Sequence, residues 1–168
     1  MRCLSKVVVL IVVLVFAIQA YPQTKPSGNS AATSCTFSDG MQISVRYHAA
    51  PVNQGKFARG EPWTPGGFPM FLFTQTALTL DSSSIPVGAY SMYVIPNEKD
   101  WTLVINKNVN ENASYDPSQD LARATMQTGR LGSKDEKVKV VFGHVSAKQC
   151  NMRIYRADTG GWTEFKER

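Results

Sequence analysis

The sequence predicts a single all-β domain with an antiparallel β-sandwich or barrel-like fold of about eight strands. Short segments rich in β-branched and aromatic residues recur along the chain, and clusters of glycine, proline, asparagine and aspartate separate them. No segment keeps the apolar period of an amphipathic helix. The chain has 168 residues, a length that suits one domain with a sizeable core.

The first half of the domain contains four of the predicted strands. In residues 41–48, apolar and polar side chains alternate, as in a strand with one face in the core and the other in water. The other three are apolar or aromatic runs bounded by turn residues, and they cover residues 70–80, 85–96 and 101–107. The last two are predicted to pair as a hairpin across the polar turn 97–100.

The second half continues this pattern after a polar loop at residues 108–119, which carries a glycosylation sequon at Asn112. Its predicted strands are again bounded by turn residues, and they cover residues 121–127, 137–146, 149–156 and 161–166. The sequence Asp-Thr-Gly-Gly at residues 158–161 predicts a tight turn before the last of them. Together with the first four, these segments make up the predicted fold.

The beginning of the chain predicts export. A basic start is followed by an unbroken apolar run at residues 7–18 and then by a small residue, Ala20. These are the parts of a secretory signal peptide, and the run is shorter than the roughly 20 apolar residues that span a membrane. We therefore expect residues 1–20 to be a signal peptide and residues 21–33 a flexible tether. Residues 34–168 would then form a periplasmic or secreted domain without a membrane span.

The cysteines fit an oxidising compartment. Cys3 lies in the predicted signal peptide, so Cys35 and Cys150 remain as an even pair. In an exported domain such a pair predicts a disulfide, and two buried free thiols are the alternative. The net charge of +5 falls to +3 without the signal peptide, and no aromatic residues interleave the late lysines. We therefore expect no nucleic-acid partner.

Residues that could carry catalysis are few. The sequence has no motif of a serine nucleophile, a zinc peptidase or a phosphate-binding loop, so no catalytic residue and no cofactor is predicted. Its two histidines are His48, on the polar face of its strand, and His144, on an apolar face. A buried histidine at His144 needs only a hydrogen-bond partner. The functional alternative is an extracytoplasmic hydrolase with a metal or acid–base site at His48 and His144. Its carboxylate would come from Glu61 or Asp39.

The tryptophans are the other indication of function, because each begins or ends a predicted strand. An exposed aromatic ring at such a place can stack on a sugar ring or cover a groove. Trp101 alternates with apolar residues and is expected in the core, whereas Trp63 lies between two prolines in a loop and is expected to be exposed. Trp162 begins the last strand. Trp63 is therefore the strongest candidate for binding.

These observations predict an exported domain that works by binding. The expected surface combines the loop at residues 62–70, which carries Trp63, with the polar strand face that carries Arg46 and His48. The partners considered are a small molecule, a glycan and an envelope protein, of which the last could dock on an exposed strand edge. The hydrolase remains the alternative interpretation.

Several segments resemble one protein family. They are residues 43–51, the pair 85–96 and 101–107, and the late segment 115–121, and they look like the secreted bacterial domain-of-unknown-function family numbered 2911. The resemblance covers roughly residues 40–167. It implies a mostly β domain exported by bacteria, and it implies no established activity.

One motif departs from the family pattern. Family members carry Trp-Arg-Thr-Gly-Ala-Asn-Glu before the long central strand, whereas residues 63–69 read Trp-Thr-Pro-Gly-Gly-Phe-Pro. The tryptophan and the first glycine match, but threonine, phenylalanine and proline replace the arginine, asparagine and glutamate. A hydrogen-bonding cluster is thus expected to become an apolar turn. If the family's polar motif supports catalysis or anion binding, this chain has lost or changed that function. If the motif is only a buried polar network, its replacement can be neutral, because all the hydrogen-bonding partners are removed together.

Overall fold

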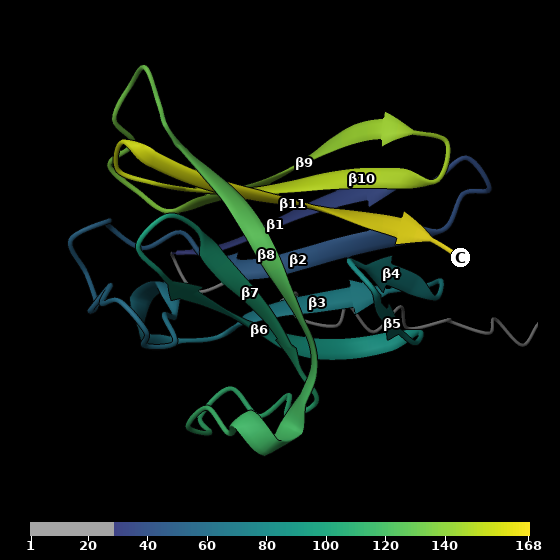
Figure 1. Ribbon diagram of the computed structural model, residues 1–168, viewed down its shortest axis with the longest axis horizontal. Helices are drawn as coiled ribbons and strands as arrows, with labels where there is room; N and C mark the ends of the chain where they lie inside the picture. The colour runs from purple at the N-terminus through teal and green to yellow at the C-terminus, as the bar shows by residue number, and fades with distance from the viewer. Residues whose placement is uncertain (1–28) are drawn as a thin grey trace, which may run out of the picture.

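Eleven antiparallel strands form one sheet in the computed structural model, which describes residues 29–168 (Figure 1). The sheet curls until it nearly closes into a barrel, which confirms the predicted fold class with more strands than the eight expected. Two short 3-10 helices interrupt the loops. The elements are β1 (Ser30–Thr36), β2 (Gln42–His48), η1 (Pro65–Gly67), β3 (Met70–Thr74), β4 (Leu78–Leu80), β5 (Ser83–Ile85), β6 (Gly88–Pro96), β7 (Trp101–Asn106), η2 (Pro117–Gln119), β8 (Asp120–Arg130), β9 (Lys139–Ser146), β10 (Gln149–Arg156) and β11 (Thr159–Glu167).

The domain begins earlier in the chain than predicted. β1 starts at Ser30 and pairs with β2, so the last four residues of the predicted tether 21–33 belong to the sheet. Cys35 is the only buried residue of β1. The strand therefore needs no alternation of apolar residues, and its sequence shows none. The predicted signal peptide and the first part of the tether lie outside the described residues.

The segment predicted as one strand at residues 70–80 is two strands. A turn separates β3 from β4, and in it the Thr74 hydroxyl donates a hydrogen bond to the Thr76 carbonyl oxygen over 2.5 Å. β4 then pairs with β5, which joins Ser83 and Ser84 from the turn residues that bound the predicted strand to Ile85, the first residue of the next predicted strand. Both strands are only three residues long, which leaves too few alternating positions for the sequence to reveal them.

Strand β8 changes its pairing partner half-way along its length. Residues 120–126 pair with β7, and residues 127–130 pair with β11. Toward its end β11 instead pairs with β4, so the β4–β5 hairpin lies where β8 and β11 diverge. Figure 1 shows β8 running diagonally across the front of the molecule. Through this change of partner, one strand connects the two halves of the sheet, which follows the order β1-β2-β3-β6-β7-β8-β11-β10-β9.

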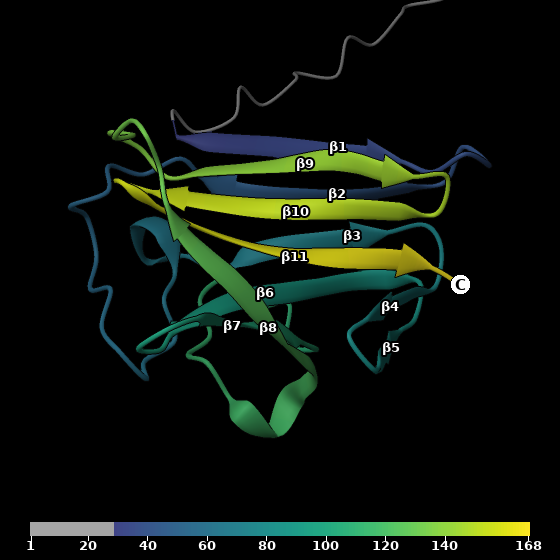
Figure 2. The same ribbon diagram turned by 45° about the horizontal axis from the view of Figure 1, so that its top comes forward.

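The first and last strands of this order, β1 and β9, lie side by side and form a seam (Figure 2). The predicted disulfide between Cys35 of β1 and Cys150 of β10 crosses the seam. Backbone hydrogen bonds join the flanking loops at its two ends. At one end Ser38 N–H donates to the Ala147 carbonyl oxygen over 3.0 Å, and at the other Val138 N–H donates to the Ala50 carbonyl oxygen over 2.8 Å.

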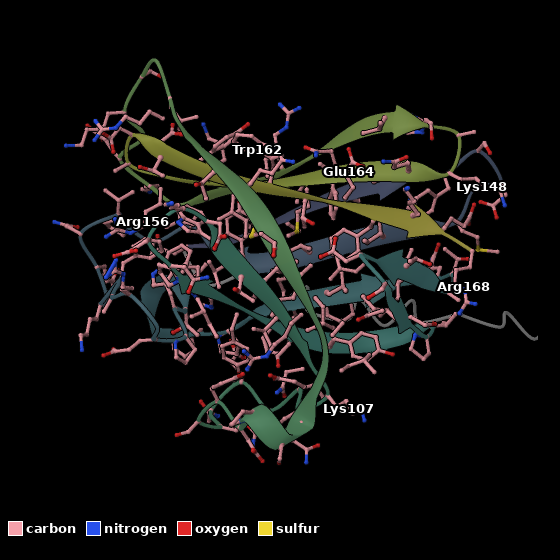
Figure 3. The ribbon with its side chains drawn as sticks, in the orientation of Figure 1. Lys107, Lys148, Arg156, Trp162, Glu164 and Arg168 are labelled. Carbon is pink, nitrogen blue, oxygen red and sulfur yellow. A yellow bond between two sulfur atoms is a disulfide. The ribbon has the colours of Figure 1, made fainter. Side chains whose placement is uncertain are left out.

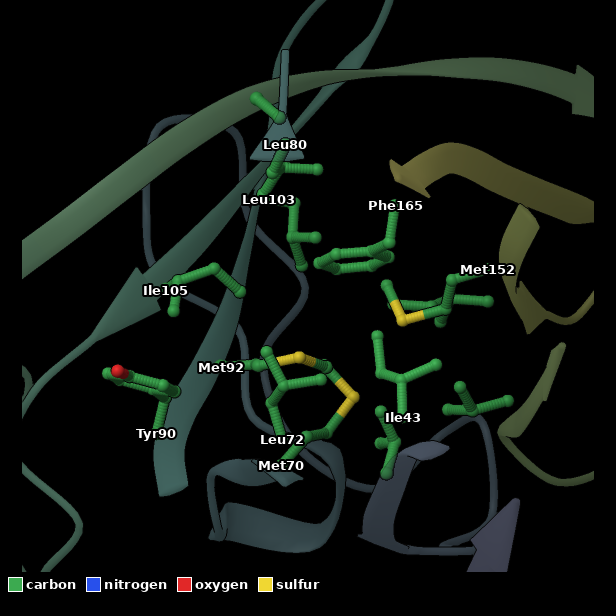
Figure 4. Packing of buried hydrophobic residues seen from close by; sticks show 14 of the residues in the cluster. Ile43, Met70, Leu72, Leu80, Tyr90, Met92, Leu103, Ile105, Met152 and Phe165 are labelled. Atoms are coloured by element: carbon green, nitrogen blue, oxygen red, sulfur yellow. The ribbon is translucent and has the colours of Figure 1, made fainter. Parts of the chain in front are cut away.

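The barrel interior holds one hydrophobic core. Figure 4 shows a part of it, where Phe165 and Met152 from β11 and β10 approach Leu103 from β7 and Ile43 from β2. Trp101 belongs to this core, as the sequence predicted. Its ring packs directly on the backbone of Gly161, where an added Cβ atom would lie 2.4 Å from the ring carbon Cε3 of Trp101. The glycine is therefore required by this close approach.

We predict that Gly161→Ala lowers the free energy of unfolding by about 1–3 kcal/mol, because the new methyl group overpacks the core against Trp101. Gly143→Ala in β9 is the matched control, since its Cβ would meet no atom within 4 Å. The control should change stability by no more than about 0.5 kcal/mol. Urea denaturation followed by circular dichroism measures both, and equal stabilities of the two variants would contradict this packing.

We also predict that the double variant Cys35→Ala, Cys150→Ala is less stable than the oxidised protein. The disulfide joins residues 115 positions apart, so its loss frees a long loop in the unfolded chain. The expected cost is about 2–5 kcal/mol. Urea denaturation of the oxidised protein and of the variant gives this difference directly, and coincident unfolding curves would show that the seam does not depend on the disulfide.

Candidate functional site

Two of the residues predicted to bind, Arg46 and His48, lie on the outer face of β2. The Arg46 guanidinium is stacked over the ring of Phe71, with its central carbon 5.2 Å from the ring centroid. The imidazole of His48 stacks on the ring of Phe68, with 4.6 Å between the centroids. Phe68 belongs to the predicted loop at residues 62–70, so the structure does bring this loop against the strand face.

Trp63 is not part of this surface, so the expectation of an exposed ring was wrong. Its side chain is only 2% exposed and belongs to the core. The backbone N–H of Trp63 donates to the Val94 carbonyl oxygen over 2.7 Å, which ties the loop to β6. This bridge extends the pairing with β6 beyond the start of β3. The indole lies in the core, where it meets the ring of Phe57 edge-on.

The two histidines of the alternative hydrolase site are not brought together. The Ala50 carbonyl oxygen binds Val138 N–H, so His48 lies beside the start of β9. His144 lies six residues beyond Val138, roughly 20 Å farther along the strand. It is also exposed rather than buried, although its direct partner on β10, Cys150, is buried.

The carboxylates considered for that site are engaged elsewhere. Glu61 forms an ion pair with Lys56 over 2.8 Å, and Asp39 accepts a hydrogen bond from the backbone N–H of Met41 over 2.9 Å. Within residues 29–168, no three histidine, cysteine, aspartate or glutamate side chains are placed to hold a metal ion. The structure therefore offers the hydrolase no assembled centre in the part of the chain that it describes.

A cleft of about 460 Å³ opens between the loop at residues 62–70 and the segment 111–115, and we call it the loop cleft. Tyr93 from β6 also lines the cleft, and its buried ring packs against the ring of Tyr115 with 4.8 Å between the centroids. The lining of the cleft includes aromatic, hydroxyl-bearing and acidic side chains, among them Thr64, Phe68, Glu111 and Tyr115, together with two prolines and an asparagine. The motif that departs from the family pattern, 63–69, thus meets Tyr115, the first residue of the family-like segment 115–121, although the two are far apart in sequence.

The first wall of the loop cleft is the turn that replaces the family's polar motif. Gly66 has a φ of 68°, a left-handed conformation that favours glycine. An added Cβ atom at Gly66 would lie 3.1 Å from the Cβ of Ala50, so the turn packs closely on the end of β2. This contact positions Phe68 over His48, and the His48 Nε2 atom lies 3.6 Å from a carboxylate oxygen of Glu111.

The second wall is held by a polar network that the sequence analysis did not identify. The Tyr115 hydroxyl donates to Asp120 Oδ2 over 2.7 Å, and Arg123 donates to the Tyr115 hydroxyl oxygen over 2.6 Å. Asn106 from β7 donates to the other carboxylate oxygen of Asp120 over 2.8 Å. The segment 115–121 was recognised only as a family resemblance, and a tyrosine, an aspartate and an arginine around a loop–strand junction are too common to predict a network.

This network keeps Tyr115 protonated. Burial, followed by the hydrogen bond to Asp120, raises the pKa of Tyr115 from its usual 10.0 to about 12. The hydrogen bond to Asp120 likewise raises the pKa of Arg123. A neutral phenol with fixed hydrogen bonds suits ligand positioning rather than nucleophilic attack, which needs a lowered pKa.

We predict that Tyr115→Phe costs about 1.5 kcal/mol of stability at neutral pH, because the Asp120 carboxylate loses a hydrogen bond. The folded-state pKa of Tyr115 lies above its unfolded value. Its contribution is therefore complete below pH 10 and is lost as the pH rises toward 12. Urea denaturation across this range should show the difference between the wild type and the variant shrinking. A difference that stays constant through the range would contradict the shifted pKa.

Comparison with known proteins agrees with the resemblance in the sequence. A family described as "Protein of unknown function (DUF2911)" matches residues 27–160, which include both walls of the loop cleft. Searches of curated proteins and of solved structures found no match. Within residues 29–168, no helix has the length and apolar character needed to cross a membrane. Since the match covers most of its length, the chain belongs to the DUF2911 family of proteins of unknown function.

Proposed function

We propose that this protein is an exported, non-catalytic domain that binds a small ligand in the loop cleft. The observation that carries the proposal is that two segments distant in sequence, the loop at residues 62–70 and the segment 111–115, form the walls of one cleft. Both segments lie within the residues that the family model matches. Export is supported by the sequence of residues 1–20 and by the disulfide between Cys35 and Cys150, a bond typical of oxidising compartments.

The lining of the loop cleft indicates the kind of ligand. Phe68, which is 37% exposed, offers apolar ring surface, and Glu111 contributes a carboxylate. A volume of about 460 Å³ lies within the usual range of small-molecule sites. The chemistry that fits best is a small molecule that combines an apolar ring with a cationic or hydrogen-bond-donating group, such as an aromatic amine.

The cleft is also held in shape before a ligand arrives. Gly66 packs one wall on β2, and the hydrogen bonds of Tyr115 with Asp120 and Arg123 tie the other wall to β8. A site built in advance avoids the entropic cost of ordering its walls on binding. The hydrolase alternative gains no comparable support, because His48 and His144 lie far apart along the sheet.

The proposal is tested by a thermal-shift panel of aromatic amines, neutral aromatic alcohols and aromatic acids on the purified, exported protein. A ligand at 100 times its dissociation constant stabilises a protein by about 2.7 kcal/mol, which raises the melting temperature by several degrees. We expect the amines to give the largest shift. Phe68→Ala and Glu111→Gln should reduce that shift, because they remove the ring and the charge from the cleft.

Val109→Ala is the matched control for these variants. Val109 is exposed and lies in the same loop as Glu111, but it does not line the cleft. The shift in melting temperature caused by the ligand should therefore persist in this variant. A shift that survives both Phe68→Ala and Glu111→Gln would place binding elsewhere and refute the proposed site. A panel without any shift would refute ligand binding of this class.

A further inference from the structure

A second cleft, of about 580 Å³, lies on the outer face of the sheet where β8, β10, β11 and β4 come together. Trp162 of β11 lies at its centre, between its direct partners Gln127 on β8 and Arg153 on β10. Figure 3 shows Trp162 beside β8 and Glu164 farther along. We call this cleft the outer groove, and we propose that it binds a neutral oligosaccharide.

The aromatic floor of the outer groove is fixed by the sheet beneath it. The indole N–H of Trp162 donates to Gln127 Oε1 over 3.0 Å. The same ring lies close to the backbone of Gly129, where an added Cβ atom would be 3.1 Å from its carbon Cη2. The ring of Tyr155 also lines the groove and lies against the backbone of Gly160. A Cβ atom added at Gly160 would be 2.8 Å from the ring carbon Cδ1 of Tyr155.

Two glycines thus allow two rings to lie against the sheet on one face. Arg153 pairs with Trp162 and Tyr155 pairs with Gly160, so the two aromatic residues are diagonal neighbours, roughly 7–8 Å apart between their Cα atoms. A pyranose ring presents a face of C–H groups of similar size. Such a face stacks on aromatic rings and gains the burial of apolar surface that they offer.

The charged groups around this floor balance one another. Arg153 and Lys166 contribute two positive charges, and Asp81 and Glu164 contribute two negative charges. An anionic ligand such as a phosphate or a nucleic acid would meet repulsion from the two carboxylates, and a cationic ligand would meet repulsion from the two bases. A neutral ligand covered with hydroxyl groups can instead donate to the carboxylates and accept from the bases.

Several of these polar groups are already held in place. Arg153 donates through Nε to Asn151 Oδ1 over 2.7 Å, and Glu164 accepts a hydrogen bond from the Gln149 side chain. Asp81 accepts a hydrogen bond from the backbone N–H of Thr125 over 3.2 Å. Arg153 and Glu164 lie on paired strands, which hold side-chain geometry better than loops do. Asp81 lies in the turn between β4 and β5 and is fixed by its hydrogen bond to β8.

The outer groove shares no lining residue with the loop cleft, so the two proposals can fail independently. The test is isothermal titration calorimetry of the full, exported protein with neutral hexasaccharides of β-1,4-glucan, β-1,4-xylan, α-1,4-glucan and chitin. An anionic oligogalacturonate serves as the charged comparison. We expect at least one neutral hexasaccharide to bind, and we expect the oligogalacturonate to bind at least tenfold more weakly.

Trp162→Ala and Arg153→Ala should each weaken the binding of the neutral hexasaccharide at least tenfold. Two matched controls should bind it as tightly as the wild type. Val145→Ala changes an exposed residue of the neighbouring strand β9, and Phe68→Ala changes the loop cleft. Circular dichroism and melting temperature establish that each variant is folded, and Arg153→Ala carries the test if Trp162→Ala does not fold.

Three results would overturn the proposal. Binding that survives both Trp162→Ala and Arg153→Ala would place the sugar outside the outer groove. Binding lost in Phe68→Ala but kept in Trp162→Ala would assign the sugar to the loop cleft. The absence of binding by every neutral hexasaccharide would show that the outer groove does not recognise neutral sugars.

Discussion

The arrangement of the whole sheet depends on the change of pairing partner in β8. Its first half belongs to the ladder with β7 and its second half to the ladder with β11. Met126, at the junction, points into the core, and the next residue, Gln127, points outward beneath Trp162. A slip of one residue would turn every side chain of β8 to the other face. It would expose Met126 and bury Gln127, so the register is strongly specified.

Both candidate sites are attached to this strand. Asp120 and Arg123, near its beginning, hold Tyr115 and with it one wall of the loop cleft. Gln127 and Gly129, near its end, orient Trp162 at the floor of the outer groove. The same backbone thus supports two surfaces with different chemistry, one acidic and aromatic, the other aromatic with balanced charges. The Cys35–Cys150 disulfide closes the sheet on its opposite side.

The sequence predicted those elements whose burial follows a simple pattern. The alternation in residues 41–48 predicted β2, and an even pair of cysteines in a chain predicted to be exported was sufficient to predict the disulfide. β1 could not be predicted because almost none of it is fully buried. The tryptophans show why site residues are harder. The sequence suggested that Trp63 and Trp162 both lie at strand ends. In the structure the bridge to Val94 turns Trp63 inward, whereas pairing opposite Arg153 turns Trp162 outward. That choice depends on tertiary pairing, which the local sequence does not reveal.

Native-state amide hydrogen exchange, measured residue by residue by NMR, tests most directly whether β8 unites the two halves of the sheet. The amides that bind β7 in residues 120–126 and those that bind β11 in residues 127–130 should exchange with the same, global free energy of opening. That result would mean that both ladders open only when the whole domain unfolds. If residues 127–130 exchanged as rapidly as the loop at residues 108–119 while residues 120–126 stayed protected, the two ladders would be independent. The account of one continuous sheet would then be wrong.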